Sequence, residues 1–547
     1  MLRKKPFSPG VSLVFFFFFF SFFFFSSFCF LVFAPCAESR TSEEEVSPSP
    51  PLDQFTPYSL QAPREAVTTR HTLSLGDLQI SYDATAGYIP IYQERQKKEL
   101  GSIFYVAYTV ADDDSSGEEG KQPPRPLTFV FNGGPGSPAI WLHMGAFAPV
   151  RGPVAKANEP MPAPPYEVQK NPWTLLPQTD LVFLDPLGTG YSLPPEESEE
   201  AREFWGIQED VRAMGDVIRM YLTRQRRWGS PIFLLGESYG GIRAAGLAPT
   251  LQDLGIALSG IIFVAPALDY GDILGNSTNE RHLVHRIPTM ALSAQYHGKG
   301  NASLTPEELW ERASLWARET YLPALWKGNL LDEEEKLRVA EELATLTGIS
   351  QETVLDWNIR IPQRIFAGEL RNDIRSFVSL YDGRLTGPGG SYRYAEDPLM
   401  GRITTPFTTA FTRYLQENLQ FVTDLTYVLS GGEAHANWNW SSGLPHGKFG
   451  YPETLENLAI AIRRDPHLRI FTAMGSYDMV CPPESIRYGL AHMDLPRETA
   501  ERVLEFHQYP GGHMMYLDEE NLKKMHEDLQ RFYEGALHSS RSALSLQ

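Results

Sequence analysis

Residues 232–241 read Ile-Phe-Leu-Leu-Gly-Glu-Ser-Tyr-Gly-Gly. The apolar run at the start predicts a buried strand, and the residues that follow Gly241 have helical periodicity. Between them lies a G-x-S-x-G pentapeptide centred on Ser238, in the strand, turn and helix context that a nucleophile elbow requires. The glycines two positions before and after the serine let strand and helix pass closely. Ser238 is therefore the first candidate for a catalytic nucleophile.

Short apolar runs alternate with longer helical patterns on both sides of this stretch. The alternation is typical of parallel strands joined by crossover helices. Two earlier runs, 78–82 and 102–108, have strand character and predict an antiparallel pair. We therefore predict an α/β fold with a mostly parallel sheet and helices on both faces. The predicted parallel strands are 127–131, 181–184, 232–235, 261–264, 468–473 and 503–507, and the predicted helices include 201–224, 241–254, 306–318 and 332–346.

The N-terminal residues have the pattern of a targeting segment. Arg3, Lys4 and Lys5 precede an apolar run that is mostly phenylalanine. Residues 1–37 therefore predict a signal peptide, or a membrane anchor where the segment is not cleaved. Either interpretation predicts an exported protein, periplasmic or extracellular, and the second adds a membrane tether. Cys481 is the only cysteine beyond this leader, so the folded part contains no intrachain disulfide.

Composition divides the rest of the chain into a core and an insertion. Residues 38–67 are rich in Ser, Glu and Pro and predict a linker. Residues 269–447 show mainly helical periodicity and interrupt the alternation, so we predict a helical cap there. The remaining segments, 68–268 and 448–537, are expected to form the core, and 538–547 a flexible tail.

The overall charge excludes one class of partner. The chain has 547 residues, of which 42% are hydrophobic and 21% charged, as in ordinary globular proteins. Its net charge of -19 and its lack of a basic cluster argue against a nucleic-acid surface, because phosphate contacts need lysine and arginine. The motifs described below require neither a metal nor an organic cofactor, and we expect none.

A serine hydroxyl needs a histidine to take its proton and a carboxylate to orient that histidine. In the elbow topology these residues follow in the order serine, acid, histidine. Two late predicted strands supply them in that order, because one leads to Asp478 and the other to His513 in a glycine-containing turn. Asp494 and Asp518 are alternatives to Asp478, but they lie in helical or polar stretches. We predict a triad of Ser238, Asp478 and His513.

An oxyanion hole needs two backbone N–H groups aimed at the developing negative charge. The turn Asn132-Gly-Gly-Pro-Gly136 directly follows a predicted strand, where the fold places one such donor. The alternative is an ordinary turn between a strand and a helix, which Pro-Gly pairs often form. We assign one donor to Gly134 and the other to Tyr239, the residue after the nucleophile.

Five motifs follow one another along the chain: Asn132-Gly-Gly-Pro-Gly136, Asp185-Pro-Leu-Gly-Thr-Gly-Tyr-Ser192, Gly236-Glu-Ser-Tyr-Gly-Gly241, Asp478 and Gly512-His513. Together they resemble the serine carboxypeptidase family, in the family's order, over about Phe104 to Tyr533. The resemblance implies an α/β-hydrolase fold. It also implies hydrolysis of C-terminal residues from peptides through an acyl-enzyme on the serine.

The resemblance also implies how a peptide with a free C-terminus is bound. Asn132 and Glu237 would hold the terminal carboxylate, together with the backbone N–H of Gly133, and Met514 would line the pocket for the departing residue. A carboxyl group repels a substrate carboxylate unless one of the two is protonated, so binding should strengthen as the pH falls.

Two positions depart from the family's pattern. Eukaryotic members have a cysteine after the Gly-Pro-Gly and several disulfides, whereas this chain has Ser137 and none, which suggests a bacterial-type branch. Many members also carry a second glutamate fourteen residues after the motif asparagine. That position is Ala146 here, and the next acidic residue is Glu159. The carboxylate clamp therefore lacks one carboxyl, and neither strict exopeptidase action nor an acid optimum follows from the motifs.

Two other functions fit the same residues. The triad could serve another acyl hydrolase or an acyltransferase, since this fold hosts many chemistries. A non-catalytic binding protein on the same scaffold is a different class, which the intact order of the triad disfavours. The sequence does not determine the preferred side chains of a substrate or the oligomeric state.

Overall fold

The structure is a computed structural model. It describes residues 65–93, 98–111, 124–155, 159, 161–194, 204–276, 278–388, 397–441 and 451–544. The predicted signal peptide or anchor and almost all of the predicted linker lie outside these described residues. Within them, every helix is too short or too polar to serve as a bilayer span.

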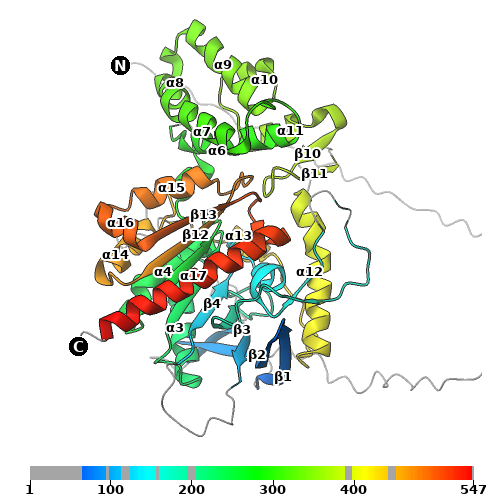
Figure 1. The fold of residues 1–547 in the computed structure, drawn as a ribbon, viewed down its shortest axis with the longest axis vertical. Helices are drawn as coiled ribbons and strands as arrows, with labels where there is room; N and C mark the ends of the chain where they lie inside the picture. The colour runs from blue at the N-terminus through cyan, green and yellow to red at the C-terminus, as the bar shows by residue number, and fades with distance from the viewer. Residues whose placement is uncertain are drawn as a thin grey trace, which may run out of the picture. The chain divides into compact units, whose positions relative to one another are not determined.

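A nine-stranded sheet lies at the centre of the described residues (Figure 1). The first three strands pair antiparallel, and β3 pairs antiparallel with β7. All other neighbours in the sheet are parallel. The strand order is β1 (Val67–Leu75), β2 (Leu78–Gln93), β3 (Lys98–Val110), β7 (Asp180–Leu184), β4 (Leu127–Phe131), β8 (Ile232–Glu237), β9 (Gly260–Val264), β12 (Arg469–Gly475) and β13 (Leu504–Tyr509).

This topology confirms the predicted fold class, an α/β-hydrolase fold with a mostly parallel sheet. Each predicted parallel strand is present; 127–131 has the predicted ends, and the ends of the others differ by at most two residues. The predicted antiparallel pair is β2 and β3, which are longer than expected. β1 was not predicted, because its side chains are mostly polar and only Leu73 is buried.

Helices cover both faces of the sheet (Figure 1). β8 shows why, because its side chains alternate between two apolar clusters. Leu234 packs with helices α3 and α4 on one face, while Phe233 packs with α17 on the other. A strand buried on both faces needs a near-continuous apolar sequence, as residues 232–235 have. The helices of the core are α1 (Ile140–Leu142), α3 (Ile207–Arg224), α4 (Gly240–Asp253), α5 (Tyr270–Leu274), α12 (Pro398–Glu417), α13 (Gly432–Ala436), α14 (Leu455–Arg464), α15 (Pro483–Ala491), α16 (Arg497–Val503) and α17 (Glu519–Leu544), with a π-helical turn η2 (His143–Phe147) and a 3-10 turn η6 (Met515–Leu517).

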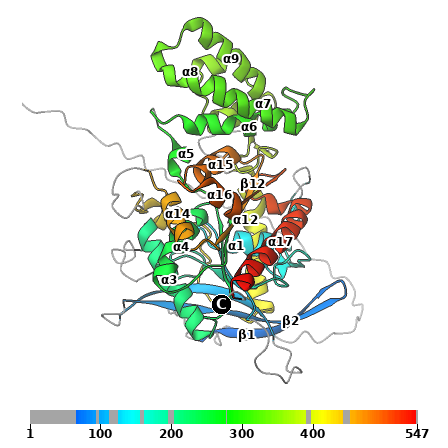
Figure 2. The same cartoon turned by 60° about the vertical axis from the view of Figure 1, so that its left-hand side comes forward.

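The insertion forms a helical cap with an apolar cluster of its own (Figure 2). Thr305 and Asp332 accept hydrogen bonds from the first N–H groups of α7 and α9, which fixes where these helices begin. The cap ends in the short sheet β10 (Ser376–Val378) and β11 (Thr386–Pro388). Its helices are α6 (Arg281–Tyr296), α7 (Pro306–Trp316), α8 (Leu322–Lys327), α9 (Glu333–Thr347), α10 (Gln351–Asp356) and α11 (Gln363–Glu369).

Two predicted boundaries differ from the structure. We expected the cap to span 269–447, but α12 lies beside the sheet and buries Leu399, Phe407 and Phe411 in the sheet's cluster (Figure 1). Helical periodicity does not reveal which core a helix covers, so α12 was assigned to the wrong layer. The second boundary is the tail expected from 538, because α17 continues to Leu544.

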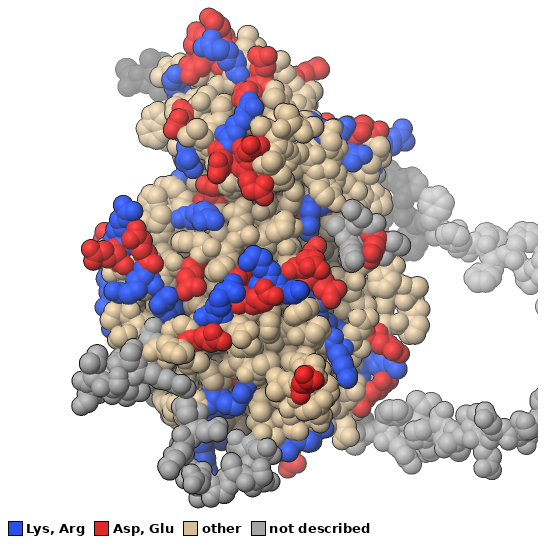
Figure 3. Space-filling view, viewed as in Figure 1, with Lys and Arg blue, Asp and Glu red and all other residues tan. Residues whose placement is uncertain are grey.

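Acidic and basic side chains are interspersed on the face seen in Figure 3, over both the cap and the core. Exposed side chains of opposite charge also form ion pairs, such as Arg338 with Glu334 in the cap. Pairs this exposed stabilise a protein by about 0–1 kcal/mol. The net charge of the chain is thus not concentrated as a uniform acidic surface on this face.

Candidate active site

The strand β8 ends at Glu237, and helix α4 begins three residues later, with Ser238 at the turn between them. Ser238 has φ of 58°, a left-handed conformation that costs a non-glycine residue of the order of 1 kcal/mol. The turn is closed by glycine: a Cβ on Gly236 would lie 2.2 Å from the carbonyl oxygen of Gly240. The sequence thus forms the sharp elbow that its glycine spacing predicts.

Asp478 and His513 are in direct contact and fully buried. His513 Nδ1 lies 2.7 Å from Asp478 Oδ2. The other oxygen, Oδ1, accepts the backbone N–H groups of Val480 at 2.8 Å and Cys481 at 2.9 Å. A carboxylate held this way keeps the proton of the imidazole on Nδ1, which leaves Nε2 free to accept a proton from a serine.

The three residues predicted to form a triad follow the carboxyl ends of neighbouring parallel strands. β8, β9, β12 and β13 are adjacent in the sheet, and Ser238, Asp478 and His513 follow the first, third and fourth of them. Burial lowers the pKa of His513, but the hydrogen-bonded Asp478 carboxylate and the neighbouring Cys481 together outweigh burial and raise that pKa well above its ordinary value. A positive charge on His513 in turn lowers the pKa of Glu237.

The cap contributes to the site through its return segment, residues 379–383. The carbonyl oxygen of Tyr381 accepts the backbone N–H of His513. A Cβ on Gly512 would lie 2.2 Å from that same oxygen, so the turn before the histidine has to be glycine. The N–H of Gly383 donates to the carbonyl oxygen of Tyr477 at 2.9 Å, on the loop that carries the triad's acid. The cap therefore touches both loops of the acid and base pair.

The turn after β4 lies directly against the elbow. A Cβ on Gly133 would lie 2.4 Å from the backbone nitrogen of Tyr239 and 2.9 Å from Cβ of Ser238. Gly134 has φ of 102°, which favours glycine. The structure thus brings the two segments assigned to the oxyanion hole, at Gly134 and Tyr239, next to the nucleophile.

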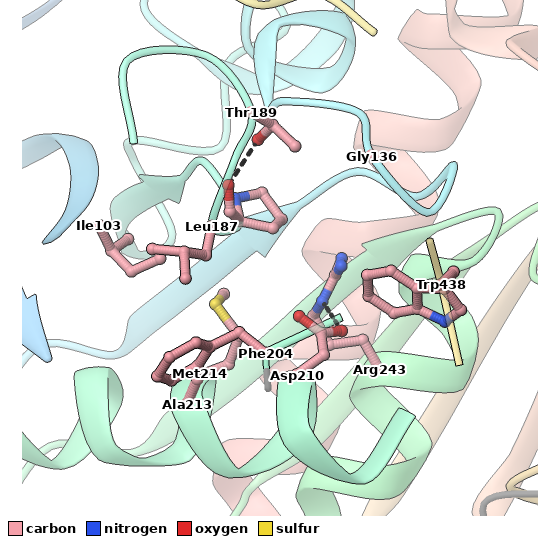
Figure 4. Close-up of a pocket in the computed structure, with 11 residues that line it drawn as sticks. Ile103, Gly136, Leu187, Thr189, Phe204, Asp210, Ala213, Met214, Arg243 and Trp438 are labelled. Carbon is pink, nitrogen blue, oxygen red and sulfur yellow. Dashed lines mark hydrogen bonds and ion pairs between the residues drawn. The ribbon is translucent and has the colours of Figure 1, made fainter. Parts of the chain in front are cut away.

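A buried ion pair supports this turn from behind (Figure 4). Arg243 Nε donates to Asp210 Oδ2 at 2.7 Å, and its Nη1 donates to the carbonyl oxygen of Asn132. The guanidinium lies 5.4 Å from the ring centroids of both Phe131 and Tyr239. The cavity beside the pair measures about 10 Å³, the space of one water, so it is too small for a substrate. Arg243 therefore acts as a support for the turn.

Asn132 and Glu237 form a buried pair beside the nucleophile. Asn132 Nδ2 donates to Glu237 Oε2, while the N–H of Leu142 donates to Asn132 Oδ1 at 3.1 Å and so orients the amide. Glu237 is 1% exposed, and burial raises its pKa to about 7, although His513, Tyr516 and Asn132 each favour the charged form. The carboxyl group is thus close to half-protonated at neutral pH.

Met514 lies in the lining of a cavity of about 40 Å³ next to the histidine. The cavity is mixed in character, because Arg384 and Asp518 line it as well as Leu399. Arg384 pairs with Asp382 at 2.7 Å and donates to the carbonyl oxygen of Pro510 at 2.7 Å. The structure therefore places Met514, the residue after His513, in the wall of a small cavity.

A comparison with known families agrees with this geometry. Residues 76–255 match the serine carboxypeptidase family model. The match includes the glycine turn, Asn132, Glu237 and Ser238 and ends before the acid and the base, which the structure supplies from later strands. It confirms the resemblance inferred from the motifs. The bacterial-type branch is a separate prediction, and the match does not bear on it.

Solved structures similar to this serine hydrolase share little sequence with it. The search of curated proteins gave no significant match. A proline iminopeptidase from Mycobacterium smegmatis is 12% identical, covers 86% of this chain and 100% of its own, and has a TM-score of 0.32. A thermostable carboxyl esterase from Bacillus coagulans is 13% identical, with coverage of 83% and 98% and a TM-score of 0.35. A soluble variant of monoglyceride lipase from Saccharomyces cerevisiae is 11% identical, with coverage of 88% and 98% and a TM-score of 0.32.

Several residues of the serine hydrolase site were not found from the sequence. Tyr516 donates to Glu237 Oε2 at 2.9 Å, and Tyr381 holds the loop of the base. Neither belongs to a motif, and a tyrosine in an apolar stretch predicts core packing. Arg243 lies in the first turn of α4, soon after the elbow. An arginine in this otherwise apolar stretch was the one sequence signal of a buried polar contact.

Cys481 is a buried free thiol beside the acid and base. One donor atom each of Asp478, Cys481 and His513 lies within 4.8 Å of the others. Such a set could hold a soft metal ion in principle. Two of its three members form the hydrogen-bonded pair that we predict to serve Ser238, so we interpret the cluster as part of the hydrolytic site.

Proposed function

We propose that the protein is a serine carboxypeptidase that removes C-terminal residues from peptides. The observation that carries the proposal is Glu237, a buried acid that immediately precedes the nucleophile and hydrogen-bonds Asn132. A fixed carboxyl group beside a hydrolytic serine is costly to bury. It becomes useful where a substrate presents a carboxylate, which a protonated Glu237 and the amide of Asn132 can both bind by donating hydrogen bonds.

The proposed reaction has two steps. In the first, His513 Nε2 takes the proton of Ser238 as its oxygen attacks the scissile carbonyl, and the N–H groups of Gly134 and Tyr239 stabilise the oxyanion. The imidazolium gives its proton to the departing amino acid, whose carboxylate is bound by Asn132, Glu237 and the N–H of Gly133. In the second, a water attacks the acyl-enzyme, and the same proton transfers release the shortened peptide.

We further propose that the substrates are peptides outside the cytoplasm. The basic, phenylalanine-rich N-terminus supports export, with or without a membrane tether. The departing residue would occupy the cavity at Met514, where Arg384 and Asp518 give charged side chains of both signs. Expression of the full chain followed by fractionation and N-terminal sequencing tests whether the protein is exported and whether the leader is cleaved.

Two measurements test the activity itself. A fluorophosphonate probe should label the wild type and leave Ser238→Ala unlabelled. A blocked dipeptide with a free C-terminus should be cleaved with kcat/KM at least tenfold above that of its C-terminal amide, because only the free acid can use Glu237 and Asn132. Labelling with equal cleavage of both substrates would point to another acyl hydrolase or acyltransferase. Absence of labelling would point to a binding protein.

A further inference from the structure

The hydrogen bonds of Glu237 differ between its two carboxyl oxygens. We infer that Tyr516 is a positioning residue that, with Asn132, keeps the proton of Glu237 on Oε1, the oxygen that meets the substrate carboxylate. The inference rests on the proposed function, in which a protonated Glu237 binds the C-terminus of a peptide. It assigns to Tyr516 the role of hydrogen-bond donor to Glu237, which a second acid would otherwise have.

Oε2 of Glu237 accepts hydrogen bonds from two neutral donors. Asn132 Nδ2 is one, and the hydroxyl of Tyr516 at 2.9 Å is the other. Oε1 is fully buried, and no hydrogen bond reaches it from the residues that the structure describes. A buried oxygen without a partner costs about 1–3 kcal/mol, which a hydrogen bond to a substrate carboxylate would offset.

This asymmetry decides which oxygen carries the proton. A protonated carboxyl has one hydroxyl oxygen, which donates, and one carbonyl oxygen, which accepts. Because two N–H or O–H groups already point at Oε2, that oxygen is the acceptor and Oε1 is the hydroxyl. Burial beside Glu237 raises the pKa of Tyr516 well above its ordinary value, so Tyr516 stays a donor throughout the working pH range.

The chain holds Tyr516 in place from several sides. The residue lies in the 3-10 turn η6, three positions after His513, and is fully buried. Its ring packs so closely on Gly145 that a Cβ there would lie 2.5 Å from the ring's Cε2. Arg151 Nη2 donates to the carbonyl oxygen of Tyr516 at 3.3 Å. The turn that follows His513 thus holds the Tyr516 hydroxyl against Glu237.

The neighbouring position Ala146 explains why a neutral donor is needed here. It is where the resemblance expects a second glutamate, and it is buried without a carboxyl group. Two acids could share one proton, whereas a single acid needs another donor to orient it. The hydroxyl of Tyr516 supplies that donor without adding a charge.

The groups that act on Glu237 fix the sign of the expected pH effect. Burial has the largest effect and raises the pKa of Glu237, and Asp478 raises it further, whereas His513, Tyr516 and Asn132 lower it. Removing the Tyr516 hydroxyl removes one of the three groups that favour the charged form. The pKa of Glu237 should therefore rise in Tyr516→Phe, and binding of free-acid substrates should persist to higher pH.

Infrared difference spectra recorded against pH measure this proton directly. Asp185 is a second buried carboxyl whose pKa burial raises to about 7, so the band of Glu237 is identified by its loss in Glu237→Gln. We expect the midpoint of that band to rise by about 1 in Tyr516→Phe, as loss of a hydrogen bond to a charged group requires. The control is Tyr509→Phe, whose hydroxyl is buried but donates to Asp528 at 2.8 Å. It should leave the midpoint unchanged.

The pH profile of kcat/KM supplies a second readout, which a mere loss of packing around residue 516 would not shift. In Tyr516→Phe the alkaline limb of the pH profile of kcat/KM for a free-acid dipeptide should move up by about 1 pH unit, because the pKa of Glu237 rises. Ester hydrolysis should keep its rate. Replacement of Tyr516 by 3,5-difluorotyrosine, a stronger donor of nearly the same size, should move the midpoint in the opposite direction.

An unchanged infrared midpoint in both Tyr516 variants would overturn the inference, as would equal loss of ester and free-acid hydrolysis. If the wild type cleaves free acids and amides equally, the proposed function fails, yet the infrared titration still decides whether Tyr516 controls the proton of Glu237. The two failures are therefore distinguishable.

Discussion

The predicted triad and the predicted carboxylate clamp each include a residue of the elbow, but the polar groups of the two sites are hydrogen-bonded in different ways. Both oxygens of Asp478 are hydrogen-bonded, one to His513 and the other to two backbone N–H groups. Glu237 has two donors on one oxygen and none, among the described residues, on the other. Both acids are buried, so burial alone does not explain the difference.

The difference indicates two kinds of task. A fully hydrogen-bonded carboxylate keeps one charge state, which suits a group that orients a base through every cycle. A buried acid with a vacant oxygen and a pKa near 7 changes its proton state with pH, which suits a group that recognises a charge. Substitutions in the predicted triad and in the predicted clamp should therefore have different effects, and the triad substitution should cost the most activity.

Asp478→Asn should damage the triad half alone. An amide in this position presents an N–H or the wrong tautomer to His513 Nδ1, so kcat/KM should fall by about 10⁴-fold for ester and peptide substrates alike. Thermal unfolding should show that the variant is folded. A loss of less than tenfold would remove Asp478 from the triad and reopen the choice of acid, with Asp494 and Asp518 as the next variants to test.

Glu237→Ala should damage the clamp half alone. Loss of a hydrogen bond to a charged group costs about 1.5–3 kcal/mol, so KM for free-acid peptides should rise by roughly 10- to 100-fold. Hydrolysis of an ester without a free carboxylate should change less than threefold. Steady-state kinetics on the matched pair of substrates measures the split, and an equal loss on both would assign Glu237 to the hydrolytic step.

Glu237→Gln should make the protein more stable at alkaline pH. Burial raises the pKa of this carboxyl from its ordinary 4.5 to about 7. Its favourable contribution to the free energy of unfolding is therefore fully present below pH 4.5 and is lost as the pH rises through 7. The loss corresponds to about 3 kcal/mol at pH 8, which the neutral amide avoids. Unfolding midpoints should therefore be higher for the variant at pH 8 and equal to wild type at pH 4. Equal midpoints at both values would contradict the raised pKa.

Cys481→Ser should have the smallest effect. Burial raises the pKa of the thiol, so the side chain is neutral, and the residue supports Asp478 through its backbone N–H, which the substitution keeps. Activity on esters should stay within about threefold of wild type, as expected for a conservative change outside the reacting groups. A hundredfold loss would instead make the thiol part of the machinery around His513.

The sequence predicted the fold because strands and turns rest on local patterns, and the triad is a prediction drawn from patterns of the same kind. Buried strands are read from apolar runs such as 232–235, and the elbow from its glycines. The position of α12 could not be read in the same way, because an amphipathic helix does not reveal which surface it covers. Tyr516 and Tyr381 were missed since their roles depend on contacts across long separations, with Glu237 in one case and the loop of His513 in the other.

The carbonyl of Tyr381 has a consequence for how the protein loses activity on heating. It belongs to the cap's return segment, yet it holds the backbone of His513. Helical caps with a separate apolar cluster can open below the temperature at which a central sheet melts. Opening would free the loop of the base, so hydrolysis should stop before the sheet unfolds. Enzymatic activity would then act as a built-in sensor of the integrity of the cap.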